Sequence, residues 1–254
     1  MSKIAIITGG SSGMGAAAAL ALAERGVHSI ITFHSNEKGA AATVAEVKKK
    51  GAKAFPLRLD LGRSDSFAAF RASVTSALES EWRTNSFDYL VNNAGFGRMA
   101  MFEDTTEEIY DEFARVILKG PYFLTQTLAP LLKDGGAIVN VASNSAMTTG
   151  LTPGYSAYAT MKGGLIVLTR CMAMEFAKRG IRVNAVSPGS TRTGMIPDEV
   201  LEKYPDVIAS LVEKTAFSRL GESQDIAGVI AALLSDDCKW VTAQNIEASG
   251  GFRL

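Results

Sequence analysis

Apolar runs of strand length alternate with amphipathic stretches of helical length along most of this chain, and this alternation constrains the fold more than any other feature. The expected strands are 4–8, 29–33, 54–59, 89–91, 137–141, 182–187 and 245–248, and the expected helices are 13–25, 37–50, 64–82, 106–132, 153–179 and 223–234. Such alternation favours right-handed βαβ units, and nearly all-apolar strands are typical of burial on two faces. The pattern predicts an α/β fold, a doubly wound parallel sheet with helices on both faces.

The chain is expected to form one domain over residues 1–254. Its 254 residues are 47% hydrophobic, and we find no internal repeat or Pro/Ser-rich linker that would divide them. Folds of this class often reach such a length undivided. The region 190–220, which holds Pro197 and Pro205, interrupts the alternation. We interpret it as an inserted flap that carries substrate contacts.

Charge and cysteine usage exclude several classes of function. The 26 basic residues balance 26 acidic ones, which gives no reason to expect a nucleic acid or a membrane as partner. Cys171 and Cys238 lie far apart, and His28 and His34 are the only histidines, so we expect no disulfide framework and no metal site. The chain enters its first strand without a leader-like segment, which favours a cytoplasmic location.

A glycine-rich turn, Thr8-Gly9-Gly10-Ser11-Ser12-Gly13-Met14-Gly15, joins the first expected strand to the first expected helix. Glycines let a backbone approach a pyrophosphate closely, and a helix N-terminus offers unpaired N–H groups and the positive end of its dipole. The turn therefore predicts a dinucleotide site, although tight turns also use glycine for steric reasons alone.

Tyr158 and Lys162 form the most reactive pair in the sequence. At this spacing on a helix, the phenol and the ammonium group project from one face. A tyrosine titrates near pH ~10 when isolated, and an adjacent cation stabilises its phenolate. We therefore expect Lys162 to lower the pKa of Tyr158 and the pair to carry out acid–base chemistry.

Several motifs together resemble the short-chain dehydrogenase/reductase family over nearly the whole chain. They are Thr8-Gly9-x-x-x-Gly13-x-Gly15, Asn92-Asn93-Ala94-Gly95, Ser143, Tyr158-x-x-x-Lys162 and Pro188-Gly189-x-x-x-Thr193, in the family's order and approximate positions. The resemblance implies a Rossmann fold and a nicotinamide cofactor, and usually a homotetramer or homodimer. It also implies hydride transfer between nicotinamide and a carbonyl or secondary alcohol substrate.

The resemblance assigns roles by position. Tyr158 would exchange a proton with the substrate oxygen, Lys162 would lower the pKa of Tyr158 and hold the nicotinamide ribose, and Ser143 would hydrogen-bond the oxygen as charge develops. The implied cofactor contacts are Gly9, Ser11, Ser12, Gly13, Met14, Gly15, Asp60, Leu61, Asn93, Ala94, Gly95, Tyr158, Lys162, Pro188, Gly189, Thr191 and Thr193.

The end of the second expected strand bears on the choice of cofactor. Enzymes that use NAD generally place an acidic residue there, and this chain has Phe33-His34-Ser35-Asn36 instead. We expect NADP(H) to be favoured over NAD(H), with His34 and Ser35 hydrogen-bonding the additional phosphate. Two features oppose this preference, because Ser12 replaces a basic residue common in NADP-dependent relatives and no arginine follows Phe33.

The residues expected in the substrate pocket are Phe96, Ser145, Met147, Tyr155 and Met195, with Ile196 beside them. Ser145 lies close enough to Ser143 in sequence to share its role.

Tyr155 has the spacing to Lys162 that is used in enoyl-thioester reductases, a divergent branch of the same family. An enoyl reductase is therefore the alternative enzyme, although Tyr158 and the other motifs favour carbonyl chemistry. Arg98 is a further candidate for contact with an acidic substrate group.

Ile117 is the clearest departure from the family pattern. The segment Val116-Ile117-Leu118-Lys119-Gly120-Pro121 matches the family except that many members have asparagine at position 117. In those members the asparagine holds a water that links the lysine to bulk solvent, which isoleucine cannot do. Three interpretations stay open: another group supplies the water path, turnover is slow, or the chain is a non-catalytic nucleotide-binding regulator.

Overall fold

Seven parallel strands form the central sheet of the part of the chain that the structure, a computed structural model, describes, namely residues 2–193 and 202–254. They are β1 (Ile4–Ile7), β2 (His28–Phe33), β3 (Ala54–Arg58), β4 (Phe87–Asn92), β5 (Leu132–Val141), β6 (Arg182–Pro188) and β9 (Asn245–Ala248). Their order in space is β3-β2-β1-β4-β5-β6-β9, and each neighbouring pair is parallel. The doubly wound Rossmann sheet predicted from the alternation is confirmed.

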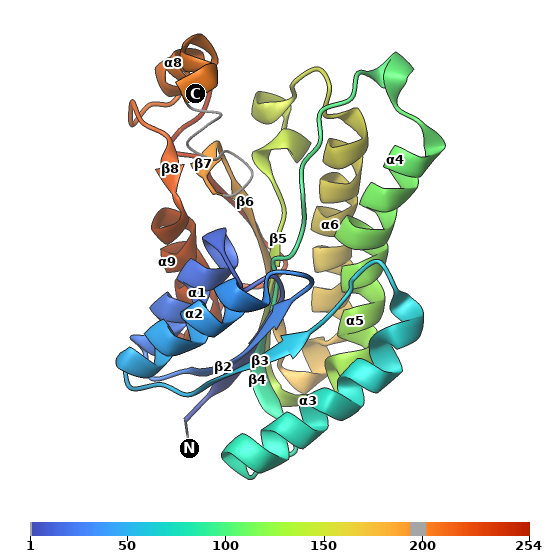
Figure 1. The fold of residues 1–254 in the computed structure, drawn as a ribbon, viewed down its shortest axis with the longest axis vertical. Coiled ribbons are helices and arrows are strands. Elements are labelled where there is room, and N and C mark those ends of the chain that lie inside the picture. Colours follow the sequence, from blue (N-terminus) through green and yellow to red (C-terminus); the bar gives the residue numbers. More distant parts are fainter. Residues whose placement is uncertain (1, 194–201) are drawn as a thin grey trace.

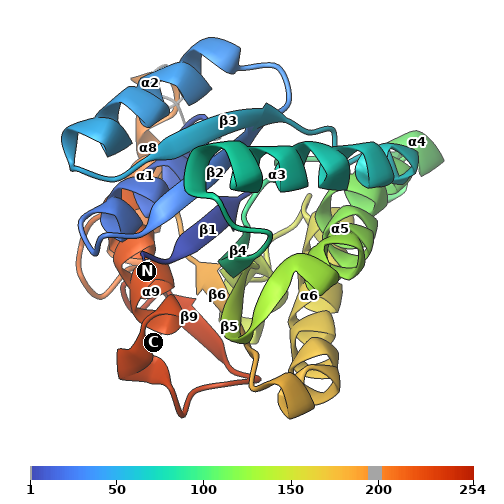
Figure 2. The ribbon, with the colours of Figure 1, turned by 90° about the horizontal axis from the view of Figure 1, so that it is seen from below.

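Helices cover both faces of the sheet, as Figures 1 and 2 show. On one face lie α1 (Gly13–Ala23), α2 (Glu37–Lys49) and α9 (Ser223–Leu234), and on the other lie α3 (Phe67–Trp82), α5 (Gly120–Leu128) and α6 (Ser156–Glu175). Successive strand side chains point to opposite faces, so Ile6 packs with α3, α5 and α6 while Ile7 packs with α1 and α9. Both faces are therefore apolar.

The helix expected over 106–132 is interrupted. It begins as α4 (Glu107–Phe113), continues as a π-helical segment over Ala114–Lys119, and becomes α5 at Gly120. Pro121 gives a physical reason, because proline has no N–H to donate to the carbonyl one α-helical turn earlier. The chain is already in β5 at residue 132, earlier than the expected 137, and a register shift beside Phe87 accommodates the longer strand.

The described parts of the region expected to be a flap, 190–193 and 202–220, lie beyond the carboxyl edge of the sheet, with α8 (Pro205–Glu213) near the top of Figure 1. A short parallel pair forms its base, β7 (Thr191–Arg192) with β8 (Gly221–Glu222), and α8 (Pro205–Glu213) lies between them in sequence. Met195 and Ile196, which the sequence assigned to the substrate pocket, lie outside the described residues.

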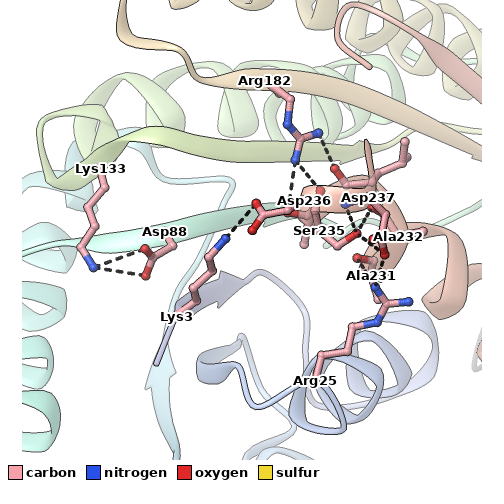
Figure 3. A network of polar contacts seen from close by, with 12 residues as sticks. Lys3, Arg25, Asp88, Lys133, Arg182, Ala231, Ala232, Ser235, Asp236 and Asp237 are labelled. Atoms are coloured by element: carbon pink, nitrogen blue, oxygen red, sulfur yellow. Dashed lines mark hydrogen bonds and ion pairs between the residues drawn. The ribbon is translucent and has the colours of Figure 1, made fainter. Parts of the chain in front are cut away.

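Ion pairs stabilise the opposite, amino-terminal edge of the sheet (Figure 3). Lys3 pairs with Asp236 at 3.2 Å, and Lys133 pairs with Asp88 at 3.3 Å. The Arg182 guanidinium donates to backbone carbonyls at the C-terminal end of α9, including that of Ser235 at 3.1 Å. These contacts join the first residues of β4 and β5 to each other and the start of β6 to the end of α9. They lie at the edge of the sheet opposite the carboxyl edge, which is left for chemistry.

Candidate active site

A cleft of about 940 Å³ opens at the carboxyl edge of the sheet, where ligands bind in open α/β folds. Its wall contains most of the residues assigned to the cofactor, together with one assigned to the substrate. They are Gly9, Ser11, Ser12, Gly13, Met14, His34, Ser35, Asp60, Leu61, Asn93, Ala94, Gly95, Phe96, Tyr158, Lys162 and Thr193. The structure thus gathers segments from six parts of the sequence into one cleft.

Some assigned residues lie elsewhere in the described structure. Gly15 packs inside the turn, where an added Cβ would lie 2.4 Å from the Gly9 carbonyl oxygen. Gly189 and Thr191 line a smaller cavity of about 240 Å³, and Pro188 ends β6. Gly15 therefore shapes the turn through close packing.

Thr8 holds the glycine-rich turn against the end of β4. Its Oγ1 donates to the Val91 carbonyl at 3.2 Å and accepts from the amides of Asn93 at 2.9 Å and Ala94 at 3.0 Å. The Asn93 side-chain amide returns to the turn, donating to the Thr8 carbonyl at 2.8 Å. This interlock fixes two walls of the cleft relative to each other.

The first turn of α1 is suited to an anion. Ser12 at the N-cap makes no side-chain capping hydrogen bond, and the first turn contains no acidic residue. The first N–H groups of a helix have no intrahelical partner and carry the positive end of its dipole. A pyrophosphate would therefore find donors here that no side chain of the cap has taken.

Ser143, Tyr158 and Lys162 lie together: Tyr158 and Lys162 line the cleft, and Ser143 lies beside Tyr158. Ser143 follows β5, and its Oγ accepts from the Ser145 amide at 3.1 Å, which leaves the hydroxyl proton for Tyr158, to which it hydrogen-bonds. The Lys162 Nζ lies 5.7 Å from the centre of the Tyr158 ring and donates to the Val141 carbonyl at 2.6 Å. All three side chains are buried.

Burial changes the acid–base properties of this group. It raises the pKa of Tyr158 above its ordinary value; the Ser143 hydrogen bond opposes this rise and Tyr155 adds to it. The net shift of the Tyr158 pKa is therefore upward, and the lowering by Lys162 that the sequence suggested stays a prediction. The physical reason for the rise is that the phenolate loses its hydration, while burial also lowers the pKa of Lys162 to about 8 and weakens its charge near that pH.

A chain of buried amides and hydroxyls supports the site from within the core. The Asn92 side-chain amide donates to the Asn140 Oδ1 at 2.8 Å, and that of Asn140 donates to the Thr169 Oγ1 at 2.8 Å. Asn140 directly precedes Val141, whose carbonyl binds Lys162. The sequence analysis recognised Asn92 but missed Asn140 and Thr169. The usable signal was that each is a polar residue within an otherwise apolar strand or helix pattern.

An aromatic cluster borders the reactive tyrosine. Phe96 stacks on Phe113 with ring centres 4.8 Å apart, and Phe113 meets Tyr158 edge-on at 5.9 Å. Tyr155 also packs edge-on against Tyr158, at 6.2 Å. Ile117 joins the cluster and is 1% exposed. The cluster gives the inner cleft an apolar side.

The other residues assigned to the substrate differ in their surroundings. Met147 packs partly buried beside Ala142, and its sulfur accepts from the Asn245 amide at 3.3 Å. Arg98 pairs with Glu112 at 3.1 Å, so its charge already has a partner. Ser145 contributes its backbone amide to Ser143, as described above.

The outer end of the cleft carries groups suited to an adenosine phosphate. His34 lies 3.6 Å from Asp60, and its carbonyl accepts from the Arg58 Nε at 3.2 Å. Arg63 lines the same cleft and pairs with Asp65 at 3.0 Å. Sequence reasoning missed Arg63, although its place just after the Asp60-Leu61 pair was a usable signal.

Other kinds of site can be considered for the described residues. These residues contain no cluster of three or more His, Cys, Asp or Glu side chains placed to hold a metal ion. Nor does any helix among them have the length and apolar character needed to cross a membrane.

Comparisons with known proteins agree with this geometry. A family model described as enoyl-(acyl carrier protein) reductase matches residues 9–253. An uncharacterised oxidoreductase of Methylorubrum extorquens is 38% identical, with 99% of this chain and 98% of that protein covered. The 3-oxoacyl-[acyl-carrier-protein] reductase FabG of Staphylococcus aureus is 34% identical, with 100% and 99% covered.

A solved structure extends the likeness to three dimensions. The angucycline C-6 ketoreductase LanV with bound NADP superposes with a TM-score of 0.92 at 31% identity, covering 99% of this chain and 95% of that one. The fold and the extent of the likeness therefore coincide with those of proteins named as reductases.

Proposed function

The chain belongs to the short-chain dehydrogenase/reductase family of NAD(P)-dependent oxidoreductases, and from this premise we propose that it is an NADP(H)-preferring carbonyl reductase acting on apolar ketones. The observation that carries the proposal is that Tyr158 and Lys162 line the cleft together while Ser143 hydrogen-bonds to Tyr158 beside it. A proton donor, an oxygen-binding hydroxyl and a cation then share one buried site.

The cleft fits a nicotinamide dinucleotide. The uncapped first turn of α1 would hold the pyrophosphate, and the Asp60-Leu61 pair and the segment after β4 would hold the adenosine. Lys162 would bind the nicotinamide ribose. When bound, the cofactor supplies or accepts the hydride.

Tyr158 and Ser143 divide the work on the substrate oxygen. In ketone reduction Tyr158 donates the proton, and in alcohol oxidation it accepts one. Ser143 donates a hydrogen bond to the oxygen as negative charge develops there. Burial raises the pKa of Tyr158, which keeps the phenol protonated before the reduction step. Lys162 stabilises the phenolate left after that step.

The surroundings of Tyr158 support an apolar substrate. Phe113 and Tyr155 pack edge-on against its ring, and Phe96, which lines the cleft, stacks on Phe113. Met99, close to Gly154, is 70% exposed. LanV is named an angucycline C-6 ketoreductase, and an angucycline carries several fused rings. We therefore place polycyclic aromatic ketones first among substrates, and 3-oxoacyl thioesters second.

The preference for NADP(H) rests on the end of β2. His34 and Ser35 line the cleft where an acidic residue would repel an added phosphate, and Arg63 adds a cation to the same wall. NADPH should bind more tightly than NADH, and His34→Asp should reverse this order. His34→Gln, which adds no charge, is the matched control. Equal or tighter binding of NADH by the unmodified protein would contradict the preference.

A substrate panel tests the reaction itself. The protein is mixed with NADPH or NADH and with a polycyclic aromatic ketone, a 3-oxoacyl thioester or an enoyl thioester, and oxidation of the cofactor is followed by absorbance. We expect NADPH-dependent reduction of a ketone. Failure to reduce either carbonyl substrate with either cofactor would count against the proposal.

An enoyl reductase is the second candidate. It is favoured by the description of the matching family model and by Tyr155, which has the required spacing to Lys162. Tyr155, however, lies partly exposed, whereas Tyr158 is buried and bonded to Ser143. Turnover of the enoyl thioester alone would establish this second function in place of the first.

A further inference from the structure

The last residues of the chain are anchored beside the segment that follows α8. Backbone amides and carbonyls of 250–253 and 214–217 bond to each other: Ala216 to Gly251 at 3.2 Å, Phe217 to Gly250 at 3.1 Å and Arg253 to Lys214 at 2.7 Å. Phe252 is 4% exposed and forms an antiparallel bridge with Thr215. The chain end is therefore fixed in position rather than frayed.

From this anchored end, the Arg253 side chain extends to the loop that joins Ser143 to Tyr158. Its guanidinium donates to the carbonyls of Thr149 and Leu151, each at 3.1 Å. It also lies 5.1 Å from the centre of the Phe252 ring. A residue distant in sequence thus holds the turn Thr148–Gly150 and the residue after it, within the loop that joins Ser143 to Tyr158.

Gly150, between those two carbonyls, rests directly on the backbone next to Ser143. An added Cβ on Gly150 would lie 2.0 Å from the Asn144 carbonyl oxygen, so no larger residue fits. Its amide donates to the Met147 carbonyl at 2.9 Å, and the Met147 amide donates to the Asn144 carbonyl at 2.8 Å. A shift of 149–151 therefore moves the residue that follows Ser143.

The backbone of Arg253 adds an independent observation. Its φ is +54°, in the left-handed region that is unfavourable for residues with a Cβ. Such conformations persist where the surroundings hold them, and they concentrate at functional positions. Glycine would relieve the strain but would lose both hydrogen bonds.

We propose that Arg253 is a positioning residue that holds the 149–151 loop and, through Gly150 and Asn144, the Ser143 hydroxyl relative to Tyr158. The proposal rests on the proposed function for its effect on turnover, but its structural part does not. Arginine suits the role because its guanidinium stays charged and its Nη1 alone carries two N–H groups, one for each carbonyl.

Two variants separate the side-chain contact from the backbone strain. Arg253→Ala and Arg253→Gly both lose the contacts to Thr149 and Leu151, while only glycine relieves the positive φ. Leu254→Ala is the control, because the Leu254 side chain is fully exposed. Each protein is measured by amide hydrogen exchange over 147–152, by NADPH affinity, and by kcat and KM for the ketone that the wild type reduces.

We expect amide exchange over 147–152 to be faster in both Arg253 variants than in the wild type, and unchanged in Leu254→Ala. The kcat should fall about tenfold, as expected when the charged hydrogen bonds to Thr149 and Leu151 no longer position the loop. NADPH affinity should change less than twofold, because the structure does not place Arg253 in the cleft wall. Should Arg253→Ala fail to fold, Arg253→Gly carries the test.

Unchanged exchange over 147–152 in Arg253→Gly would overturn the proposal, whatever the activity. Faster exchange with unchanged kcat would also overturn it, because the loop would then not position Ser143. If exchange accelerates while the wild type reduces no substrate of the panel, the loop contact is supported and the proposed function fails.

Discussion

At the scale of single residues, the function depends on what burial does to Tyr158 and Lys162. In the sequence they are a phenol and an ammonium group at helical spacing. In the fold both are buried, and their pKa values move in opposite directions, that of Tyr158 upward and that of Lys162 down to about 8. Near neutral pH the phenol is therefore protonated and Lys162 still carries most of its positive charge, so the cation is present to stabilise the phenolate that forms when Tyr158 gives up its proton.

The two tyrosines give the first prediction. Tyr158→Phe should lower kcat for ketone reduction by at least about a hundredfold, the usual contribution of a positioned proton donor, while NADPH affinity stays nearly constant. Tyr155→Phe, the matched control, should lower kcat far less, because only Tyr158 bonds to Ser143. Steady-state kinetics and a binding titration check both. Loss of activity in the 155 variant with a tolerated change at 158 would transfer the role to Tyr155.

Lys162 gives a prediction on pH and stability. Its pKa falls from 10.5 to about 8 on folding, so between these values the unfolded state binds more protons and stability rises with pH. Relative to Lys162→Met, the wild type should gain free energy of unfolding as pH rises from 7.5 to 10. The full effect is on the order of 3 kcal/mol, from ~1.4 kcal/mol per pH unit.

Denaturant unfolding of both proteins without cofactor at several pH values measures this difference. Subtracting the variant cancels the titration of groups common to both chains. A difference that stays flat across the range would show that Lys162 keeps its ordinary pKa on folding, and a difference that falls with pH would show that its pKa is raised; either result would contradict the prediction.

At the scale of elements, the departure at Ile117 falls inside the π-helical segment Ala114–Lys119. This π-helical turn is present although position 117 lacks the asparagine that many family members have. The Ile117 side chain packs with Phe113, Ala157 and Met161 beside Tyr158. Of the interpretations left open by the sequence, this packing favours a helix adapted to isoleucine, with proton resupply by another route.

Ile117→Asn tests this interpretation. A buried amide without partners should lower the free energy of unfolding by ~1–3 kcal/mol, and we expect no increase in kcat. Ile117→Val, which removes one methylene and adds no polar group, should cost ~0.5–1.5 kcal/mol and serves as control. Melting temperature and kcat of the two variants decide the matter. A faster Asn variant would mean that missing water access limits the wild type.

At the scale of the whole molecule, large apolar side chains remain exposed on the outer faces of helices and beyond α9. Tyr122 on α5, Val167 and Met174 on α6, and Trp240 after α9 are 47%, 58%, 79% and 97% exposed. Exposed apolar groups of this size are common at contacts between subunits. They support the homotetramer or homodimer implied by the family resemblance.

We therefore predict that the protein sediments as a dimer or tetramer. Analytical ultracentrifugation at micromolar concentration measures the mass directly. Val167→Glu together with Met174→Glu should shift the mass toward the monomer, because a charge buried between subunits is costly. Lys178→Glu, at an exposed position that is already charged, provides the control. A monomeric mass at every concentration would contradict the predicted dimer or tetramer.

The fold followed from local patterns because each strand and helix carries its own apolar periodicity, and parallel strands joined by helices admit few arrangements. The glycine-rich turn and the pair Tyr158 and Lys162 were recognisable for the same reason, since each lies within one short segment. The expected limits of strands and helices were less exact in two places. Pro121 removes a hydrogen bond from the preceding helical turn, and the bulge beside Phe87 shifts the pairing of β4 with β5.

What only the tertiary structure decided is what depends on burial and on contacts between distant segments. The sequence places a cation beside Tyr158, but desolvation by the surrounding core sets the direction of its pKa shift. Arg253 gives no sequence signal, because its hydrogen bonds to Thr149 and Leu151 join residues more than a hundred positions apart. Periodicity and motif spacing report local geometry, whereas hydration and long-range contacts exist only once the chain has folded.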